Sequence, residues 1–433
     1  VGITGSIPDD FTAVGNTVYF VAGTAAAGNE IWKTDGTAAG TTMVKDINPG
    51  TFGSNPSYLL EMNGMLYFRA FNSLSGTELW KSDGSTGGTV MVKDIYPGSG
   101  NGIAAYITKI NATLYFMASN GATGAELWKS DGTAAGTVLI KDIATGSADG
   151  SPVNLTNANG TLFFTADDGT HGTEIWKSDG STAGTVLVKD IYAGTNTSDI
   201  KNKTVINGTV FFTASDGISG TELWKTNGTA AGTVMVKDIN AGPANSSPDG
   251  LFNLNGVLFF YANDGVHGQE LWKSDGTAAG TVMIKDIYAG SASSLPYVFA
   301  GMNGVVYLAA SDASHGRELW RSDGTDAGTL LVKDMWPGTG AGFPALLLAD
   351  NGIMYLQGND GTTGTELWKS DGTQTGTVLV KDIKPGSDGS YPFGMVKLGN
   401  AFYLSVIEPV YGQELWKTDG TAAGTVLVKD IWP

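Results

Sequence analysis

The sequence contains no cysteine, and this absence excludes several structures and chemistries at once. Disulfides, thiolate metal sites and cysteine nucleophiles all need that residue. Histidine is scarce too, with 3 residues in a chain of 433. No apolar run reaches the roughly 18 residues that a membrane-spanning helix needs, so membrane insertion is not expected.

Charged residues are few and unbalanced. They make up 15% of the chain, with 42 acidic against 25 basic residues and a net charge of −17. Nucleic acids and anionic membrane surfaces attract basic patches, so neither is expected as a partner. Low charge and abundant small polar residues favour an extracellular or cell-surface location. No signal peptide is visible and the chain begins in phase with the repeat described next, so we expect a mature or excised product.

The most informative feature present is an internal repeat, which has a period of 48 residues and no insertion or deletion. A glutamate stands two residues before a tryptophan in every unit, and a Lys-Asp pair follows it. Nine units fill the chain. Repeats of this length with strand-like character are typical of propellers and solenoids. The nine tryptophans, which we expect to form the blade core, are Trp32, Trp80, Trp128, Trp176, Trp224, Trp272, Trp320, Trp368 and Trp416.

Each unit predicts four short strands. In the second unit they cover residues 57–62, 65–70, 78–83 and 89–95. Asn-Gly separates the first two, and this dipeptide favours a type I′ hairpin turn because both residues tolerate positive φ. The third and fourth strands are joined by an Asp-Gly turn in which the aspartate accepts backbone hydrogen bonds. The Asn-Gly asparagines are Asn63, Asn159, Asn207, Asn255, Asn303 and Asn351.

Both faces of each predicted sheet are apolar. Leu79 and Trp80 are adjacent in a strand and point to opposite faces, yet both are large and apolar. An open solenoid would need polar end units, whereas the first and last units keep the template. The fold class predicted is therefore all-β: a single nine-bladed β-propeller of four-stranded blades over residues 1–433. The blades cover approximately residues 1–48, 49–96, 97–144, 145–192, 193–240, 241–288, 289–336, 337–384 and 385–433.

The stretch Glu-Leu-Trp-Lys-Ser-Asp-Gly-Thr-Ala-Ala-Gly-Thr at 270–281 resembles the bacterial ELWxxDGT-repeat proteins. This resemblance covers the whole chain and implies a large secreted or surface protein without an assigned activity. The unit is also similar to a kelch blade, although the Gly-Gly doublet of that family is missing. Ser-Asp-Gly-Thr is similar to the sialidase Asp-box, but the spacing differs and the chain has three arginines (Arg69, Arg317 and Arg321), so a sialidase-like arginine triad is not expected.

The two faces of the predicted ring differ in sequence. One carries the nearly constant Asn-Gly and Asp-Gly turns, and the other carries variable loops rich in acidic residues. Function concentrates in loops on a rigid scaffold, so the variable face is the predicted recognition surface. Calcium prefers carboxylates in glycine-rich loops and is the candidate cofactor, although solvated turns without metal are the favoured alternative. The candidate calcium ligands are Asp168, Asp216, Asp264, Asp312 and Asp360.

Two other sets of residues are candidate sites. The set Glu270, Lys273, Lys285 and Asp286 is repeated in all nine units, with Arg321 in place of the first lysine in one of them, so it predicts a structural network of paired charges rather than catalysis. Aromatic residues at the end of a unit favour stacking on sugar rings, with packing at the blade junction as the alternative. These candidate ligand-binding residues are Tyr96, Tyr192, Tyr288, Trp336 and Trp432.

From the sequence, the favoured function is that of a non-enzymatic extracellular or cell-surface propeller that binds or adheres through its variable loops. Its partner would be an extracellular glycan or protein. The alternative is a structural subunit that self-associates into a filament or surface layer. A glycan-processing enzyme with its site at the ring axis is a further, less favoured alternative, because no catalytic motif or single-copy catalytic cluster is present.

Overall fold

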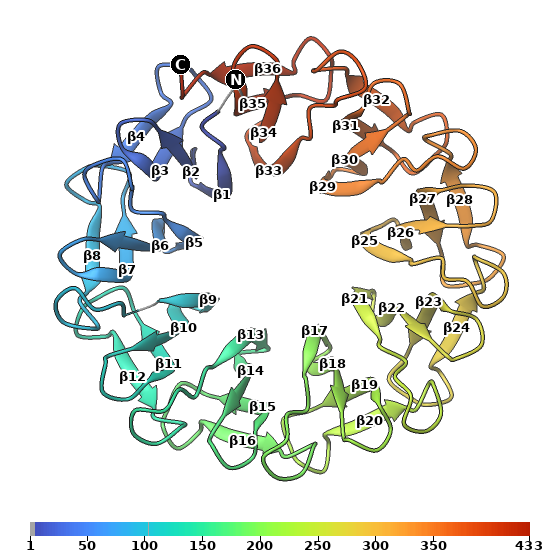
Figure 1. Ribbon diagram of the computed structural model, residues 1–433, viewed down its shortest axis with the longest axis horizontal. Coiled ribbons are helices and arrows are strands. Elements are labelled where there is room, and N and C mark those ends of the chain that lie inside the picture. The colour runs from blue at the N-terminus through green and yellow to red at the C-terminus, as the bar shows by residue number, and fades with distance from the viewer. Residues whose placement is uncertain (1–4, 103) are drawn as a thin grey trace.

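The computed structural model describes residues 5–102 and 104–433 of the chain. These residues form nine four-stranded antiparallel sheets arranged in a closed ring, in which the last sheet lies next to the first (Figure 1). The predicted nine-bladed β-propeller is therefore confirmed. Within the described ranges, no helix is long and apolar enough to cross a membrane.

The strands of each blade follow chain order from the ring axis outward (Figure 1). The innermost strands are β1 (Asp9–Val14), β5 (Ser57–Met62), β9 (Ala105–Ile110), β13 (Val153–Ala158), β17 (Lys201–Ile206), β21 (Asp249–Leu254), β25 (Tyr297–Met302), β29 (Ala345–Asp350) and β33 (Phe393–Leu398). The second strands are β2 (Thr17–Thr24), β6 (Met65–Asn72), β10 (Thr113–Ser119), β14 (Thr161–Asp167), β18 (Thr209–Ser215), β22 (Val257–Asn263), β26 (Val305–Ser311), β30 (Ile353–Asn359) and β34 (Ala401–Glu408).

The outer half of each blade contains the repeated tryptophan. The third strands are β3 (Gly28–Thr34), β7 (Gly76–Ser82), β11 (Ala125–Ser130), β15 (Thr173–Ser178), β19 (Thr221–Thr226), β23 (Gln269–Ser274), β27 (Arg317–Ser322), β31 (Thr365–Ser370) and β35 (Gly412–Thr418). The outermost strands are β4 (Thr42–Lys45), β8 (Val90–Lys93), β12 (Val138–Lys141), β16 (Val186–Lys189), β20 (Val234–Lys237), β24 (Val282–Lys285), β28 (Leu330–Lys333), β32 (Val378–Lys381) and β36 (Val426–Lys429).

The turns on the constant face have the predicted geometry. Asn63 and Gly64 have φ of 54° and 77°, as a type I′ hairpin requires. In the Asp-Gly turn, Asp275 Oδ1 accepts hydrogen bonds from Thr277 N at 2.8 Å and Thr277 Oγ1 at 2.7 Å. Both predictions of turn chemistry are confirmed, and the repeated short polar residues on this face are used to shape the backbone.

The core lies between blades, and each third strand contributes to two interfaces. Leu271 is fully buried and packs toward blade seven with Val306, whereas Trp272 packs toward blade five with Leu223. Adjacent strand residues point to opposite faces, so both side chains are buried only because both faces are covered. Truncating a buried tryptophan typically costs about 3–5 kcal/mol, which makes this residue the main apolar anchor of the interface.

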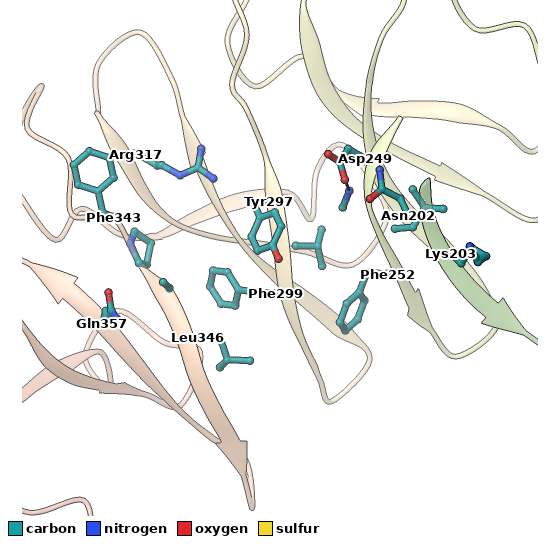
Figure 2. A pocket seen from close by; sticks show the side chains of 15 residues that line it. Asn202, Lys203, Asp249, Phe252, Tyr297, Phe299, Arg317, Phe343, Leu346 and Gln357 are labelled. Carbon is teal, nitrogen blue, oxygen red and sulfur yellow. Dashed lines mark hydrogen bonds between the residues drawn. The ribbon is translucent and has the colours of Figure 1, made fainter. Parts of the chain in front are cut away.

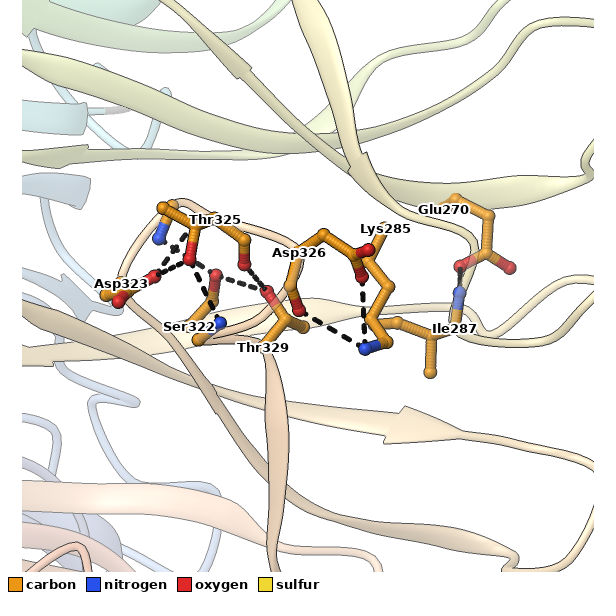
Figure 3. A network of polar contacts seen from close by, with 10 residues as sticks. Glu270, Lys285, Ile287, Ser322, Asp323, Thr325, Asp326 and Thr329 are labelled. Carbon is orange, nitrogen blue, oxygen red and sulfur yellow. Dashed lines mark hydrogen bonds and ion pairs between the residues drawn. The ribbon is translucent and has the colours of Figure 1, made fainter.

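The repeated glutamate binds the backbone of the loop that leads to the next blade. Glu270 accepts hydrogen bonds from Ile287 N (2.8 Å), Ser294 N (2.9 Å) and Ser294 Oγ (2.7 Å) (Figure 3 shows the first contact). Its side chain is fully buried, and burial raises the pKa of Glu270 against the effect of these donors. The predicted pairing of Glu270 with lysine is therefore wrong, because backbone N–H groups already satisfy the carboxylate.

The repeated lysines likewise bind backbone oxygens rather than the glutamate. Lys273 Nζ donates to Gly324 O at 2.8 Å, in the next blade. Lys285 Nζ also reaches the next blade, where it donates to Asp326 O at 3.2 Å and in addition forms an ion pair with Asp326 Oδ1 at 3.1 Å (Figure 3). Asp286 Oδ2 accepts from Gly290 N at 3.1 Å. These contacts connect neighbouring blades, and they explain the repeated charged residues without an acid–base function.

The ring closes with the same contacts that join the other blades. Ser6 N and Ser6 Oγ donate to Glu414 at 2.9 and 2.6 Å. Lys417 Nζ binds Gly36 O at 2.9 Å, and Lys429 Nζ binds Thr41 O at 2.7 Å. Blades one and nine each keep four consecutive strands, so no strand is exchanged across the closure.

Candidate functional site

The innermost strands carry a β-bulge, and its position differs between blades. In β17, Lys201 pairs with Thr213 and Thr204 with Phe211, so the register shifts between them. Asn202 has a φ of 53°. Asparagine and glycine adopt this left-handed conformation more readily than other residues. Residues at the equivalent position in six other blades also have positive φ: Asp10, Tyr58, Tyr106, Asn154, Gly250 and Gly394.

Blades seven and eight place the bulge one residue later. In β25, Val298 pairs with Leu308 and Ala300 pairs with Tyr307, which leaves Phe299 as the extra residue. β29 has the same arrangement, with Leu347 as the extra residue. Valine is β-branched and disfavours positive φ, which gives a physical reason for the shift in β25.

The displaced bulge changes which side chains face the neighbouring blades. Val298 is 5% exposed and packs in the interface with blade six, the role that Leu59 has in its own blade. Phe299 instead packs toward blade eight, where it joins Leu346 against a buried cluster. The change in the position of the bulge therefore places Phe299 on the opposite side of its strand from the equivalent residue Leu59.

A cavity of about 750 Å³ lies along β17, β21, β25 and β29, where the bulge changes position. Phe252, Phe299 and Leu346 provide apolar wall, and Tyr297 and Phe343 are 51% and 58% exposed. Figure 2 shows these side chains around the cavity, with Arg317 and Asp249 on opposite sides of it. The polar residues that line it are Asn202, Lys203, Asp249, Arg317 and Gln357.

Arg317 is the most distinctive polar group of the cavity. It begins β27, and the equivalent residue is uncharged in every other blade. Its Nη1 donates to Leu295 O at 2.7 Å, the one hydrogen bond found for this side chain among the described residues. Burial lowers the pKa of Arg317, although a guanidinium stays charged at neutral pH. The remaining N–H groups of the Arg317 guanidinium are therefore available to bind an anionic group.

The carboxylate of Asp249 is held on the other polar side. Its Oδ1 accepts a hydrogen bond from Gly250 N at 2.6 Å. Tyr261 is paired with Asp249 across the two strands. Burial, together with the charge of Asp249, raises the pKa of Tyr261 to about 12. Tyr261 thus stays a neutral phenol at physiological pH.

Lys203 occupies a position that is apolar in the other eight units. Its Nζ is buried and has no hydrogen-bond partner in the described part of the chain. Burial lowers the pKa of Lys203 to about 7 because the charged form loses its hydration. The equivalent residues are Phe11, Leu59, Ile107, Leu155, Leu251, Phe299, Leu347 and Met395.

The aromatic residues predicted to bind sugars lie elsewhere, at the junctions between blades. Tyr96 and Trp336 are 38% and 37% exposed, and the other three are half-buried. The rings of Tyr96 and Trp336 each cover a glycine of the next blade: a Cβ on Gly121 would lie 2.4 Å from Tyr96, and one on Gly361 would lie 2.5 Å from Trp336. This placement accounts for their packing, and stacking on sugars stays a prediction for Tyr96, Tyr192, Tyr288, Trp336 and Trp432.

The loop aspartates proposed as calcium ligands shape their own loops. Asp264 Oδ1 accepts from Val266 N and His267 N, both at 2.9 Å, and Oδ2 lies 2.8 Å from His267 Nδ1. The described residues contain no group of three or more metal-ligating side chains. Calcium binding therefore stays a prediction for the five aspartates. The same kind of loop contact is made by Asp168, Asp216, Asp312 and Asp360.

Sequence reasoning missed the cavity, although a signal for it was present. Arg317 and Lys203 are single-copy basic residues at positions that are uncharged in every other unit. Comparing the nine units position by position would have separated them from the template. The volume of the cavity could not be found in this way, because it depends on the bulge and on which face Phe299 takes.

By fold and site, the chain is a nine-bladed β-propeller with an axial cavity that carries an isolated guanidinium. No protein-family model and no curated protein sequence matches it. Solved structures that it resembles include a puromycin hydrolase (13% identity, TM-score 0.42, 98% of this chain and 54% of that one). Others are a Mycobacterium tuberculosis puromycin-hydrolyzing peptidase (10%, 0.43, 87% and 52%) and a prolyl endopeptidase (13%, 0.42, 82% and 54%).

These comparisons contradict the function predicted from the sequence. The similar structures are peptidases, so the predicted function as a non-enzymatic binding or adhesion module, with its filament and glycan-processing alternatives, is withdrawn. The extracellular or cell-surface location stays a prediction. The chain spans about half the length of each of these structures. With TM-scores below 0.5 and identities of 10–13%, the similarity assigns no activity to this chain.

Proposed function

We propose that the chain is a ligand-selecting propeller whose axial cavity takes a molecule with an apolar or aromatic body and one carboxylate group. The observation that carries this proposal is the single guanidinium of Arg317, which borders a cavity walled by Phe252, Phe299 and Leu346. Arginine recognises carboxylates through a planar fork of donors. Ligand pockets typically combine an apolar lining with a few polar groups that fix orientation.

The charge of the whole molecule makes Arg317 more significant. With a net charge of −17, the protein repels anions at long range. A carboxylate ligand must therefore be recognised by close contact, in a place where a cation is partly desolvated and its interactions are stronger than in water. Arg317 meets this requirement because it is half-buried and lies at the cavity.

The proposal assigns recognition to this chain rather than a catalytic step. No serine, cysteine or histidine is found among the described residues that line the cavity. Elsewhere, Thr170 Oγ1 and Asp168 Oδ2 both contact Nδ1 of His171, so they share one ring nitrogen. A nucleophile–base–acid relay uses both imidazole nitrogens, which this cluster does not provide.

The test is binding of short peptides that end in phenylalanine, compared as free acids and as C-terminal amides. Isothermal titration should show tighter binding of the free acid. Arg317→Gln places the residue found at Gln269 and Gln413 in this position, so the fold should be retained. We expect the dissociation constant of the free acid to rise about 10- to 100-fold, the effect of losing a charge-assisted hydrogen bond.

Arg321→Lys is the matched control for the loss of an arginine. It introduces the lysine that the other eight units have at this position, on the same strand as Arg317. Binding of the free acid should be unchanged in this variant. Equal affinity for free acid and amide, or an Arg317→Gln variant that binds as the natural protein does, would overturn the proposed function.

A further inference from the structure

The lining of the axial cavity contains two opposite charges that are not paired with each other. Asp249 begins β21 in blade six and Arg317 begins β27 in blade seven, and Figure 2 shows them on opposite sides of the cavity. Among the described residues, the hydrogen bond found for Arg317 goes to Leu295 O, and Asp249 Oδ1 accepts from the adjacent Gly250 N. Neither side chain forms an ion pair there, so both charges are available to a ligand.

Both charged groups are also accessible. Asp249 and Arg317 are half-buried, and Asp249 Oδ2 and the Nε and Nη2 atoms of Arg317 reach solvent. The third charged residue of the lining, Lys203, differs because its Nζ is buried. Tyr261 is paired with Asp249 across the two strands, and its raised pKa keeps it a neutral phenol, so it does not cancel the charge of the carboxylate. The cavity therefore offers a ligand one cation and one anion.

A ligand whose only charge is a carboxylate would compensate only Arg317. Its entry would remove water from Asp249 and leave that carboxylate without a counter-ion, which costs free energy. An ammonium group at the other end of the ligand replaces this cost with an attraction, and the attraction is stronger in a partly desolvated site than in water. The two charges together therefore select a molecule that carries both groups and disfavour one that carries a carboxylate alone.

The placement of the charges favours a peptide over a single amino acid. In an α-amino acid the ammonium and the carboxylate are attached to the same carbon, so they cannot reach opposite sides of a cavity of about 750 Å³. Each further residue of an extended chain moves the two ends apart by up to roughly 3.3–3.6 Å. Phe252 and Phe299 line the same cavity and suit an aromatic side chain between the two ends.

We propose that the axial cavity binds short peptides whose two ends are both unblocked, with the C-terminal carboxylate at Arg317 and the N-terminal ammonium at Asp249. The inference rests on the proposed function, which places a carboxylate at Arg317, and it adds the ammonium as a second recognised group. The net charge of −17 attracts the ammonium end at long range, and the contact with Arg317 then fixes the carboxylate end.

The experiment is isothermal titration with alanyl-phenylalanine and with 2-methylpropanoyl-phenylalanine, in which a methyl group replaces the ammonium. The two ligands share their shape and their carboxylate, so the difference between them reports the ammonium. Alanyl-alanyl-phenylalanine and its methyl analogue are measured as well, and the tighter-binding length is used for the comparison. We expect the ammonium ligand to bind about tenfold more tightly than its methyl analogue, the effect of one charge-assisted contact.

Two variants show whether the preference for the ammonium comes from Asp249. Asp249→Asn keeps an oxygen that can accept from Gly250 N and removes the charge, so the preference should fall below about twofold. The methyl analogue should bind this variant no more weakly than it binds the natural protein, which shows that the cavity is intact. Asp9→Asn is the matched control, because Asp9 is the equivalent residue of blade one, accepts from Asp10 N at 2.7 Å and lines a different cavity. It removes the same charge and should keep the full preference.

The outcomes separate this inference from the proposed function. Equal affinity for the ammonium ligand and its methyl analogue, or a preference that survives in Asp249→Asn, would overturn the inference. Binding that still depends on the ligand carboxylate and on Arg317 would then leave the proposed function standing. Binding that depends on neither the carboxylate nor Arg317 would overturn both.

Discussion

The third strand of each blade is nearly the same in all nine units, whereas the innermost strand shares few residues between units. In β23, Leu271 and Trp272 are both buried because neighbouring blades cover both faces. The innermost strand β25 has Tyr297 51% exposed toward the axial side. A residue packed between two blades has to fit both of them, and a residue facing the axis does not. Side chains that face the axis can therefore differ from one blade to the next.

The largest expected effect concerns the third strand, whose side chains pack between blades. Trp320 is 6% exposed and packs against the buried core between blades six and seven. Trp320→Ala should lower the free energy of unfolding by about 3–5 kcal/mol, because it removes a large buried ring and leaves a cavity. Denaturant titration measures this value. Phe299→Ala, on an innermost strand, is the comparison and should cost clearly less. Similar losses in the two variants would show that the interface is not the main anchor.

Lys203→Leu should instead stabilise the protein. Leucine stands at this position in blades two, four, six and eight, so its shape is compatible with the innermost strand. We expect a gain of about 1–3 kcal/mol, because a buried amine without a partner is replaced by an apolar side chain. The folded pKa of about 7 is below that of the unfolded chain, so the cost of this lysine grows as the pH falls toward 7. Denaturant titrations should show a larger gain at pH 6 than at pH 10.

The position of the bulge can be exchanged between blades. Val298→Asn supplies a residue that tolerates positive φ, as Asn202 does in β17. The bulge should then move back by one residue, return Phe299 to the interface with blade six and narrow the cavity. We expect a stability change of about 1 kcal/mol and weaker ligand binding. A crystal structure of the variant with residue 298 still extended would show that the bulge is fixed by something other than this side chain.

The smallest expected effect concerns pH. Burial raises the pKa of Glu78 to about 7, above the ordinary value of 4.5. The folded state then binds this proton more tightly than the unfolded state, so the stabilisation present below pH 4.5 is lost as the pH rises toward 7. Thermal unfolding between pH 5 and 8 should show a falling midpoint. Glu78→Gln should make this fall slightly less steep, and an unchanged slope would place the titration in other groups.

Much of the fold could be predicted from the repeat. The positions of Leu271 and Trp272 on one strand required two covered faces, and the asparagine of Asn63-Gly64 required a hairpin. The partners of Glu270 could not be predicted, because they are backbone N–H groups that the sequence does not display. The same holds for Phe299, whose direction depends on where the bulge lies in β25.

Closure of the ring without strand exchange has a consequence for how such a chain could be rearranged. The contact between Glu414 and Ser6 is chemically the same as that between Glu222 and Ser246 inside the chain. The closure is thus joined in the same way as a junction inside the chain, so the polypeptide can be cut at such a junction and rejoined at the closure. A circular permutant opened between blades four and five and linked across the present closure should assemble the same ring. The blades then keep the same cyclic order, so the residues that line the axial cavity do not depend on which blade begins the chain.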